Sequence, residues 1–141
     1  MLDALYQDEI IHLSRQSRQR GRLEAPDASA RVDNPLCGDR VTMDLEIKDG
    51  RITAVGHRVR GCALCEAAAE VIAENAIGLD IESLSKVEAA TRGYLASDAA
   101  SPPWTKLSIF EPVRDVKSRH ECVYLPFTAS INAFSEFCEK R

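Results

Sequence analysis

The alternation of apolar and polar residues predicts a helix followed by a pair of antiparallel strands. Residues 2 to 20 carry apolar side chains at helical spacing, and a basic last turn followed by Gly21 is typical of a helix end. A short segment at residues 28 to 32 is able to pair as a strand. Residues 41 to 47 alternate apolar with polar side chains, and a Lys-Asp-Gly-Arg turn at 48 to 51 leads into a second extended run. This arrangement favours a β-hairpin.

The period changes at Cys62, where an alanine-rich helix begins that Gly78 closes. A second helix is expected from a cap near Asp80, followed by a loop with two adjacent prolines. A short helix interrupted near Pro112 comes next, and a closing helix is expected to hold Pro126 in its first turn, where the missing N–H has no intrahelical partner. The order indicates an α+β fold: a small antiparallel sheet of about three strands with helices packed on one face.

Composition narrows the class of protein. The chain has 141 residues, 45% of them hydrophobic and 28% charged, as expected for a single domain with its own core. A net charge of -4 argues against a nucleic acid or a membrane as partner. No run approaches the roughly 20 apolar residues of a membrane span, and the start lacks the apolar segment of a signal peptide, so we expect a cytoplasmic protein. Five cysteines in that reducing compartment favour metal binding or thiol chemistry over disulfides.

Candidate metal ligands flank the predicted hairpin. Cys37 and Asp39 stand on either side of one glycine just before the first strand, so their side chains can converge on one ion if the chain turns there. Cys62 follows the second strand at a helix N-terminus, where the helix dipole favours a thiolate. Because the two ends of a hairpin lie side by side, these three residues are expected at one edge of the sheet. If the junction at Cys122 faces the same edge, three thiolates and one carboxylate suit Zn²⁺ or an iron-sulfur cluster.

The chain resembles a known family at these positions. The stretch "NPLCGD", the stretch "GCALCEAAAEVI" with its first cysteine 25 positions on, and a third cysteine before the C-terminal helix resemble the U-type iron-sulfur cluster assembly scaffolds (IscU, the NifU N-terminal domain, SufU). The opening helix is similar as well, so the likeness covers nearly the whole chain. The gap of 60 positions from Cys62 to Cys122 is similar to the SufU type. The resemblance implies one NifU/IscU-like scaffold domain over residues 1–141, with an insertion at about 88–113.

The resemblance also implies roles for individual residues. Cys37, Asp39, Cys62 and Cys122 would bind Zn²⁺ and/or a [2Fe-2S] cluster, and Cys37 would accept persulfide sulfur from a cysteine desulfurase of the SufS type. Arg119 would lie beside a thiolate or carboxylate of the site. A downstream iron-sulfur carrier or an apo-protein would receive the cluster.

The sequence departs from the family at three places, which leaves alternative functions open. Glu121 stands where IscU-type chains have histidine, Cys65 replaces a small residue, and the customary Asn-Pro after the first helix is missing. The first departure weighs against IscU-like cluster chemistry. A zinc-dependent sulfurtransferase that activates the desulfurase without assembling clusters is therefore one alternative to a scaffold without enzymatic activity. A structural zinc module that binds a protein is another.

Structural interpretations are favoured for the remaining residues of chemical interest. Cys65 fits a buried, inert thiol better than a redox partner of Cys62, and Cys138 fits packing or exposure. His120 fits a solvated or capping role better than a metal ligand, and Trp104 fits an anchor of the insertion. Surface positions are expected for four further titratable residues: His12, His57, Glu70 and Glu74.

Overall fold

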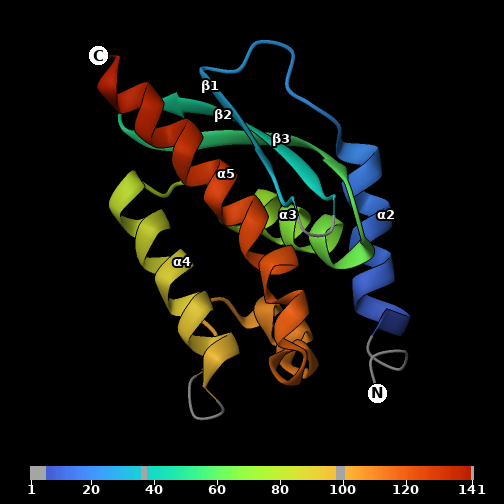
Figure 1. The fold of residues 1–141 in the computed structure, drawn as a ribbon. Helices are drawn as coiled ribbons and strands as arrows, with labels where there is room; N and C mark the ends of the chain where they lie inside the picture. Colours follow the sequence, from blue (N-terminus) through green and yellow to red (C-terminus); the bar gives the residue numbers. More distant parts are fainter. Residues whose placement is uncertain (1–5, 36–37, 98–100, 141) are drawn as a thin grey trace.

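A computed structural model describes residues 6–35, 38–97 and 101–140 of the chain (Figure 1). It contains a three-stranded antiparallel sheet and helices that are segregated from the strands in sequence, which confirms the α+β prediction. In chain order the elements are η1 (Tyr6–Ile10), α2 (Ile11–Arg20), β1 (Ala28–Asp33), β2 (Arg40–Lys48), β3 (Arg51–Arg60), α3 (Ala63–Asn75), α4 (Ile81–Ala96), η2 (Thr105–Asp115), η3 (Lys117–Arg119) and α5 (His120–Glu139).

The predicted hairpin is confirmed, and β1 adds a third strand to it. The strand order is β1-β2-β3, and Arg40 pairs with Arg60 at the end of the hairpin opposite the turn. Asp49 and Gly50 in the turn have φ of 56° and 76°, which is the left-handed conformation that both central residues of a type I′ turn require. The Asp-Gly pair therefore fixes the register of β2 against β3.

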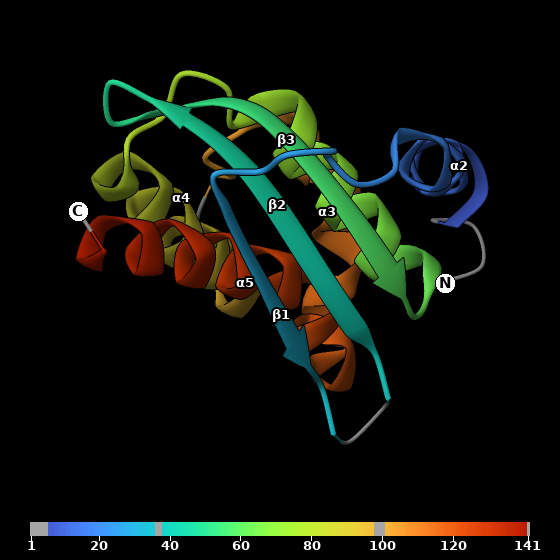
Figure 2. The same cartoon turned by 90° about the horizontal axis from the view of Figure 1, so that it is seen from above.

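Helices cover only one face of the sheet (Figure 2). Alternate β2 residues such as Val41, Met43 and Leu45 point to that face and are buried, and β2 packs against α5. The alanine-rich helix α3 packs under β3, α5 crosses β1 and β2, and α4 lies outside α5. Within the described residues no helix lies over the opposite face, which only the connection at 21–27 crosses. We call this opposite face the outer face of the sheet.

The closing helix begins earlier than expected. It starts at His120, so Cys122 lies in its first turn rather than before it, and Pro126 is buried beyond the first turn, contrary to the prediction. A proline there removes the backbone hydrogen bond to the Cys122 carbonyl at a cost of about 3 kcal/mol. Burial of the ring offsets part of this cost, and the Ser130 hydroxyl donates to the Pro126 carbonyl at 2.8 Å.

The segment before α5 also differs from the expectation. It forms a 3₁₀-helix, η2, that runs through Pro112 without a break, and the interruption comes at Val116, where φ and ψ are -122° and 80°. Residues 88–96 continue α4, so the first part of the expected insertion is regular helix. The insertion at 88–113 itself stays a prediction.

Across the described parts of the chain, none of the helices combines the length and the apolar character that a bilayer crossing requires.

Candidate metal centre

Asp39, Cys62 and Cys122 come together at the end of the sheet where β2 begins and β3 ends. One ligand atom of each lies within 4.8 Å of the others. The Cys122 Sγ is 3.5 Å from Asp39 Oδ2, and the Cys62 Sγ is 4.0 Å from the same oxygen. The structure thus brings together three of the four predicted ligands from separate parts of the sequence: the residue before β2, the N-cap of α3 and the first turn of α5.

The strand register explains why Asp39 meets Cys62. The pairing of Arg40 with Arg60 leaves Asp39 and Gly61 as neighbours just beyond the last ladder position. A Cβ atom on Gly61 would lie 2.5 Å from Asp39 Oδ1, so only glycine leaves room for this carboxylate. No role was predicted for Gly61, although a glycine directly before a candidate ligand at a strand end is the signal of a close approach.

Cys37, the predicted persulfide acceptor, lies outside the described residues. Its neighbours in the loop are held by backbone hydrogen bonds: the Gly38 N–H donates to the Asn34 carbonyl at 2.8 Å, and the Asn34 N–H donates to the Asp39 carbonyl at 2.8 Å. Gly38 has φ of 76°, which supplies the sharp turn expected between Cys37 and Asp39. The role of Cys37 as ligand and sulfur acceptor stays a prediction.

The two described site cysteines differ in acidity. A hydrogen bond with the Cys122 thiol lowers the pKa of Cys62 to about 6, helped by backbone N–H groups at the start of α3 and opposed by burial and by the charge of Asp39. The pKa of Cys122 is raised, because its proton is held in the bond to Cys62 and because the thiol is buried. Near neutral pH the pair of Cys62 and Cys122 therefore presents one thiolate, and an incoming metal ion displaces the proton that the pair retains.

The donor set fits a metal ion. Zinc binds thiolate at about 2.3 Å and carboxylate at about 2.0–2.2 Å, so neighbouring ligand atoms of a tetrahedral site lie about 3.6–3.8 Å apart. The distances of 3.5 and 4.0 Å from Asp39 Oδ2 to the two sulfurs are close to this spacing. Two soft sulfurs and one hard oxygen suit zinc or a cluster iron, and three ligands leave a fourth position for Cys37 or for an incoming sulfur.

An open cleft lies beside the Asp39 carboxylate of the centre. The side chains of Asp39 and Cys122 are buried, with 5% and 2% of their surface exposed, whereas Cys62 is only half-buried. The cleft has a volume of about 460 Å³, and it is lined by Asp33, Asn34, Pro35, Gly38, Asp39, Arg40 and Arg60. Among the described residues, a partner or a small reagent thus approaches the centre at the rim between residues 33–35 and 38–40 and the end of β3.

The other candidate residues take the structural positions that were favoured. His120 Nε2 lies 2.9 Å from the Val113 carbonyl oxygen and 3.2 Å from that of Arg114, so the ring caps the preceding 3₁₀-helix. Cys65 is completely buried in α3. Cys138 is exposed near the end of α5, about 24 Å along the helix from Cys122 at 1.5 Å per residue. Arg119 precedes α5 and is exposed; its role beside the thiolates stays a prediction.

The surface positions expected for His57 and Glu70 are wrong. Their side chains are buried, and His57 Nε2 lies 3.1 Å from Glu70 Oε1. Arg20 of α2 binds the same carboxylate through two hydrogen bonds of 2.9 and 2.8 Å. One turn earlier on α3, Glu66 is bound by Arg18 of α2 in the same way. These pairs depend on how α2 packs against α3, which the local sequence patterns do not show.

Comparison with known proteins agrees with this fold. Residues 5–97 match the family described as NifU-like N terminal domain. The iron-sulfur cluster assembly scaffold protein IscU 1 of Archaeoglobus fulgidus is 28% identical over 94% of this chain and 84% of its own. A crystal structure of the N-terminal part of a nitrogen-fixing NifU-like protein from Brucella abortus is 32% identical, with a TM-score of 0.85 over 99% of both chains. The SufU protein of Fervidobacterium islandicum AW-1, 22% identical over 93% of this chain and 97% of its own, shares the fold with a TM-score of 0.74.

Proposed function

The chain belongs to the NifU-like N-terminal domain family, and we propose that it is a scaffold on which iron-sulfur clusters are assembled and then handed on. The observation that carries the proposal is the convergence of Asp39, Cys62 and Cys122 at an accessible rim of the sheet. The cluster is the cargo of such a protein. Relatives named as cluster assembly scaffolds support the same function.

In the proposed mechanism the described residues hold the metal and Cys37 delivers the sulfur. Cys62, which is a thiolate near neutral pH, captures the metal first, and Asp39 and Cys122 complete the set. The Cys37 thiolate attacks the outer sulfur of a persulfide on a cysteine desulfurase. The sulfur-sulfur bond of that persulfide breaks, the desulfurase cysteine leaves as a thiolate, and a persulfide remains on Cys37. Reduction of this sulfur to sulfide needs two electrons from an external donor.

The mixed donor set suits a protein that releases what it binds. A carboxylate is a weaker partner for a cluster iron than a thiolate, so the Asp39 corner opens more easily than the others. We propose a SufS-type desulfurase as sulfur source and an iron-sulfur carrier or apo-protein as recipient. Thiol chemistry of this kind needs reducing conditions, so we place it in the cytoplasm.

Single cysteine substitutions test the proposed site. Cys62→Ser and Cys122→Ser are expected to abolish stoichiometric metal binding, measured by elemental analysis of protein purified without oxygen. Cys138→Ser is the matched control and is expected to bind as the unmodified chain does, because this thiol is exposed near the far end of α5. When iron, sulfide and a reductant are added, the unmodified chain and Cys138→Ser should develop the visible absorption of a cluster. Cys62→Ser and Cys122→Ser should not. Equal metal content in all three variants would show that the site is misassigned.

A zinc-dependent sulfurtransferase is the second candidate, and one observation favours it. Glu121, exposed on the surface, precedes Cys122, and the nearby His120 ring is engaged with backbone carbonyls, so neither position supplies an imidazole to the metal. Incubation with desulfurase, cysteine, iron and reductant separates the two functions. Persulfide on Cys37 without cluster absorption supports the sulfurtransferase, whereas cluster absorption supports the scaffold.

A purely structural zinc module has a different signature. Its zinc would resist mild chelation, and the domain would unfold when the zinc is removed.

A further inference from the structure

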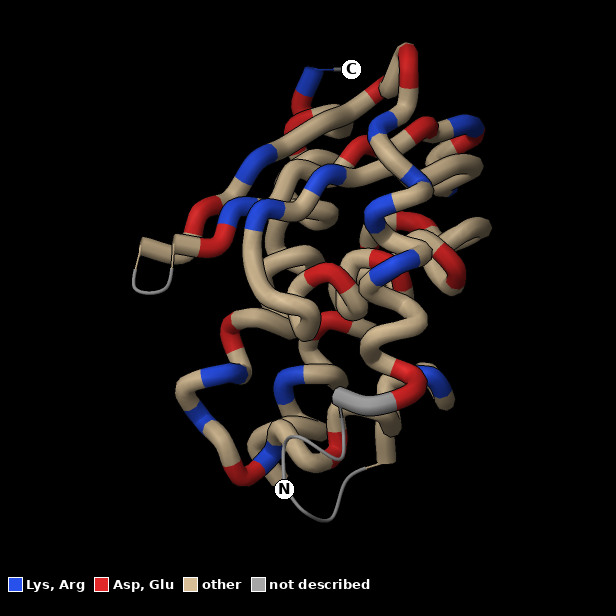
Figure 3. Tube along the Cα trace, turned by 90° about the vertical axis from the view of Figure 1, so that its right-hand side faces the viewer, with Lys and Arg blue, Asp and Glu red and all other residues tan. Residues whose placement is uncertain are grey.

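The outer face of the sheet carries an unusual concentration of arginine. A cleft of about 220 Å³ on this face is lined by Arg22, Arg31, Arg40, Thr42, Arg58 and Arg60. Figure 3 shows the basic segments gathered across neighbouring strands, although the whole chain has a net charge of -4. We call these five arginines the arginine face.

The strand register places Arg40 of β2 and Arg60 of β3 directly opposite each other and brings Arg31 of β1 and Arg58 of β3 to the two sides of Thr42. Paired residues on adjacent strands project from the same side of a sheet, and like charges directly opposite each other destabilise it. The Arg40–Arg60 pair therefore contributes repulsion rather than stability to the sheet unless an anion lies between the two groups.

Acidic residues of the chain neutralise only part of this charge. Asp44 is buried and binds Arg22 through hydrogen bonds of 2.8 and 2.9 Å. Asp33 lies 3.0 Å from Arg40 and 4.0 Å from Arg31.

Two arginines of this face are left over. Arg58 and Arg60 are exposed and have neither an ion pair nor a hydrogen-bonded side-chain partner within residues 6–35, 38–97 and 101–140. Two guanidinium groups thus remain available to an external anion.

The arginine face is continuous with the rim of the candidate metal centre. Arg40 and Arg60 line both the arginine cleft and the larger cleft beside Asp39. Asp39 directly precedes Arg40, and Cys62 follows Arg60 by two positions. A partner held by these arginines therefore lies against the side from which the centre is reached.

We propose that the arginine face docks an acidic segment of a partner protein and so positions that partner at the metal centre. This proposal rests on the proposed function, in which a protein must approach the centre to deliver sulfur or collect a cluster. Guanidinium groups bind carboxylates in a bidentate manner. Arg58 and Arg60 are two residues apart on one strand, about 7 Å, which is also the spacing of carboxylates on one side of an extended acidic segment. Asp33, Asp44 and the negative net charge disfavour the long phosphate backbone of a nucleic acid.

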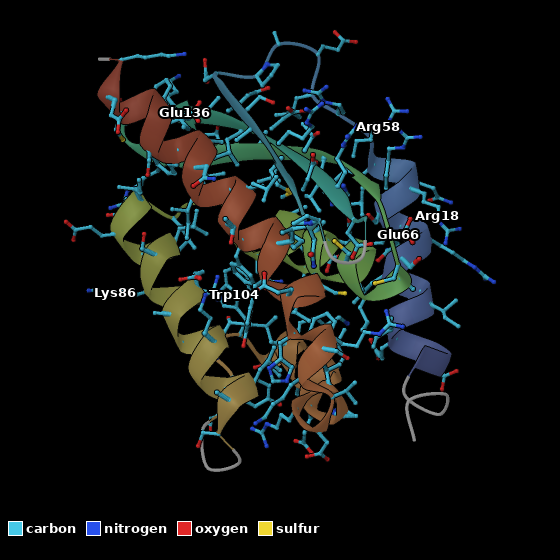
Figure 4. All side chains as sticks on the ribbon, viewed as in Figure 1. Arg18, Arg58, Glu66, Lys86, Trp104 and Glu136 are labelled. Carbon is cyan, nitrogen blue, oxygen red and sulfur yellow. The ribbon has the colours of Figure 1, made fainter. Side chains whose placement is uncertain are left out.

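Charge reversal tests the proposal on the full chain. The probe is a fluorescent peptide of ten glutamates, and binding is measured by fluorescence anisotropy at low and at moderate salt. Arg58→Glu and Arg60→Glu are each expected to weaken binding by at least about fivefold, and added salt should weaken binding to the unmodified chain. Lys86→Glu makes the same charge change at an exposed position on α4, on the side of the molecule away from Arg58 (Figure 4), and is expected to stay within about twofold.

Other outcomes overturn the proposal. It fails if the unmodified chain shows no saturable binding of the peptide, or if Lys86→Glu weakens binding as much as Arg58→Glu. Tighter, equally arginine-dependent binding of a ten-nucleotide oligothymidylate would show that the face binds nucleic acid instead. Metal content and cluster formation from free iron and sulfide are measured on Arg58→Glu, whose side chain does not line the cleft beside Asp39, and should not change. Loss of cluster formation in every sample, including the unmodified chain, would count against the scaffold function alone.

Discussion

Gly61 sets the position of the Asp39 carboxylate at the residue scale. The backbone of Gly61 does not adopt the left-handed conformation, so an alanine can take the same backbone angles. Its Cβ atom, however, would lie only 2.5 Å from the Asp39 carboxylate. We predict that Gly61→Ala displaces the carboxylate and weakens zinc binding by about tenfold or more, the usual effect of disturbing the support of a metal ligand. Competition with a coloured zinc chelator measures the change.

Gly93→Ala is the matched control for this substitution. Gly93 lies within α4, and a Cβ added there would meet no atom within 4 Å. Alanine favours a helix interior over glycine by about 1 kcal/mol, so this variant should be slightly more stable and bind zinc normally. Normal zinc affinity in Gly61→Ala would contradict the prediction. It would mean either that the Asp39 carboxylate can shift without losing the metal or that Asp39 is not a ligand.

At the scale of elements, Glu70 joins α2, α3 and β3 through Arg20 and His57. Burial alone would raise the pKa of Glu70, but the hydrogen bonds with His57 and Arg20 outweigh it and lower the pKa to about 2. Because the folded-state pKa is below the ordinary value of 4.5, the stabilisation is complete above pH 4.5 and is lost as the pH falls toward 2. Glu70→Gln should therefore lower the free energy of unfolding near neutral pH by about 2 to 3 kcal/mol.

Chemical denaturation at several pH values checks this prediction. The difference between Glu70→Gln and the unmodified chain should be largest above pH 5 and should shrink as the pH falls below 4.5. Glu74→Gln, one turn further along α3 and exposed, should stay within about 0.5 kcal/mol. A difference that does not change between pH 7 and pH 3 would contradict the ion-pair explanation.

The hairpin and half of the candidate site follow from local sequence patterns. The period of two on β2 and the Asp49-Gly50 turn act within a few residues, so they specify strand and register without knowledge of the rest of the fold. Once the hairpin is known, the meeting of Asp39 with Cys62 is a geometric consequence. Cys122 is different, because its arrival at the same point depends on how α5 crosses the sheet, and no local pattern encodes that crossing.

The incorrect expectations share a cause, which is packing between elements that are distant in sequence. Glu70 has the spacing of a solvated residue on α3, and only the approach of Arg20 from α2 makes its burial favourable. Pro126 lies beyond the first turn of α5, where it is buried. Local propensity gives no access to either contact.

At the scale of the whole molecule, Trp104 fastens the segment between α4 and α5 to the body. Its ring lies 5.8 Å from that of Phe127, which is fully buried in α5. We predict that Trp104→Ala lowers the free energy of unfolding by about 2 kcal/mol, less than the 3–5 kcal/mol of a fully buried aromatic residue because this ring is partly exposed. Metal binding should be unchanged. Thermal unfolding and elemental analysis measure the two effects.

Ile77→Ala serves as the comparison for Trp104→Ala. Ile77 is a large apolar residue that is 50% exposed, so its truncation should cost less than about 0.5 kcal/mol. Loss of metal in Trp104→Ala, with the fold intact, would show that the segment before α5 also supports the centre.

The position of Cys122 in the last helix has a consequence for biosynthesis. The proposed ligands on the hairpin and at the start of α3 leave the ribosome early, but the chain cannot close the centre until the first turn of α5 has emerged and docked. A ribosome-bound chain truncated before residue 120 should therefore hold zinc loosely or not at all, whereas a chain that has exposed all of α5 should hold it firmly.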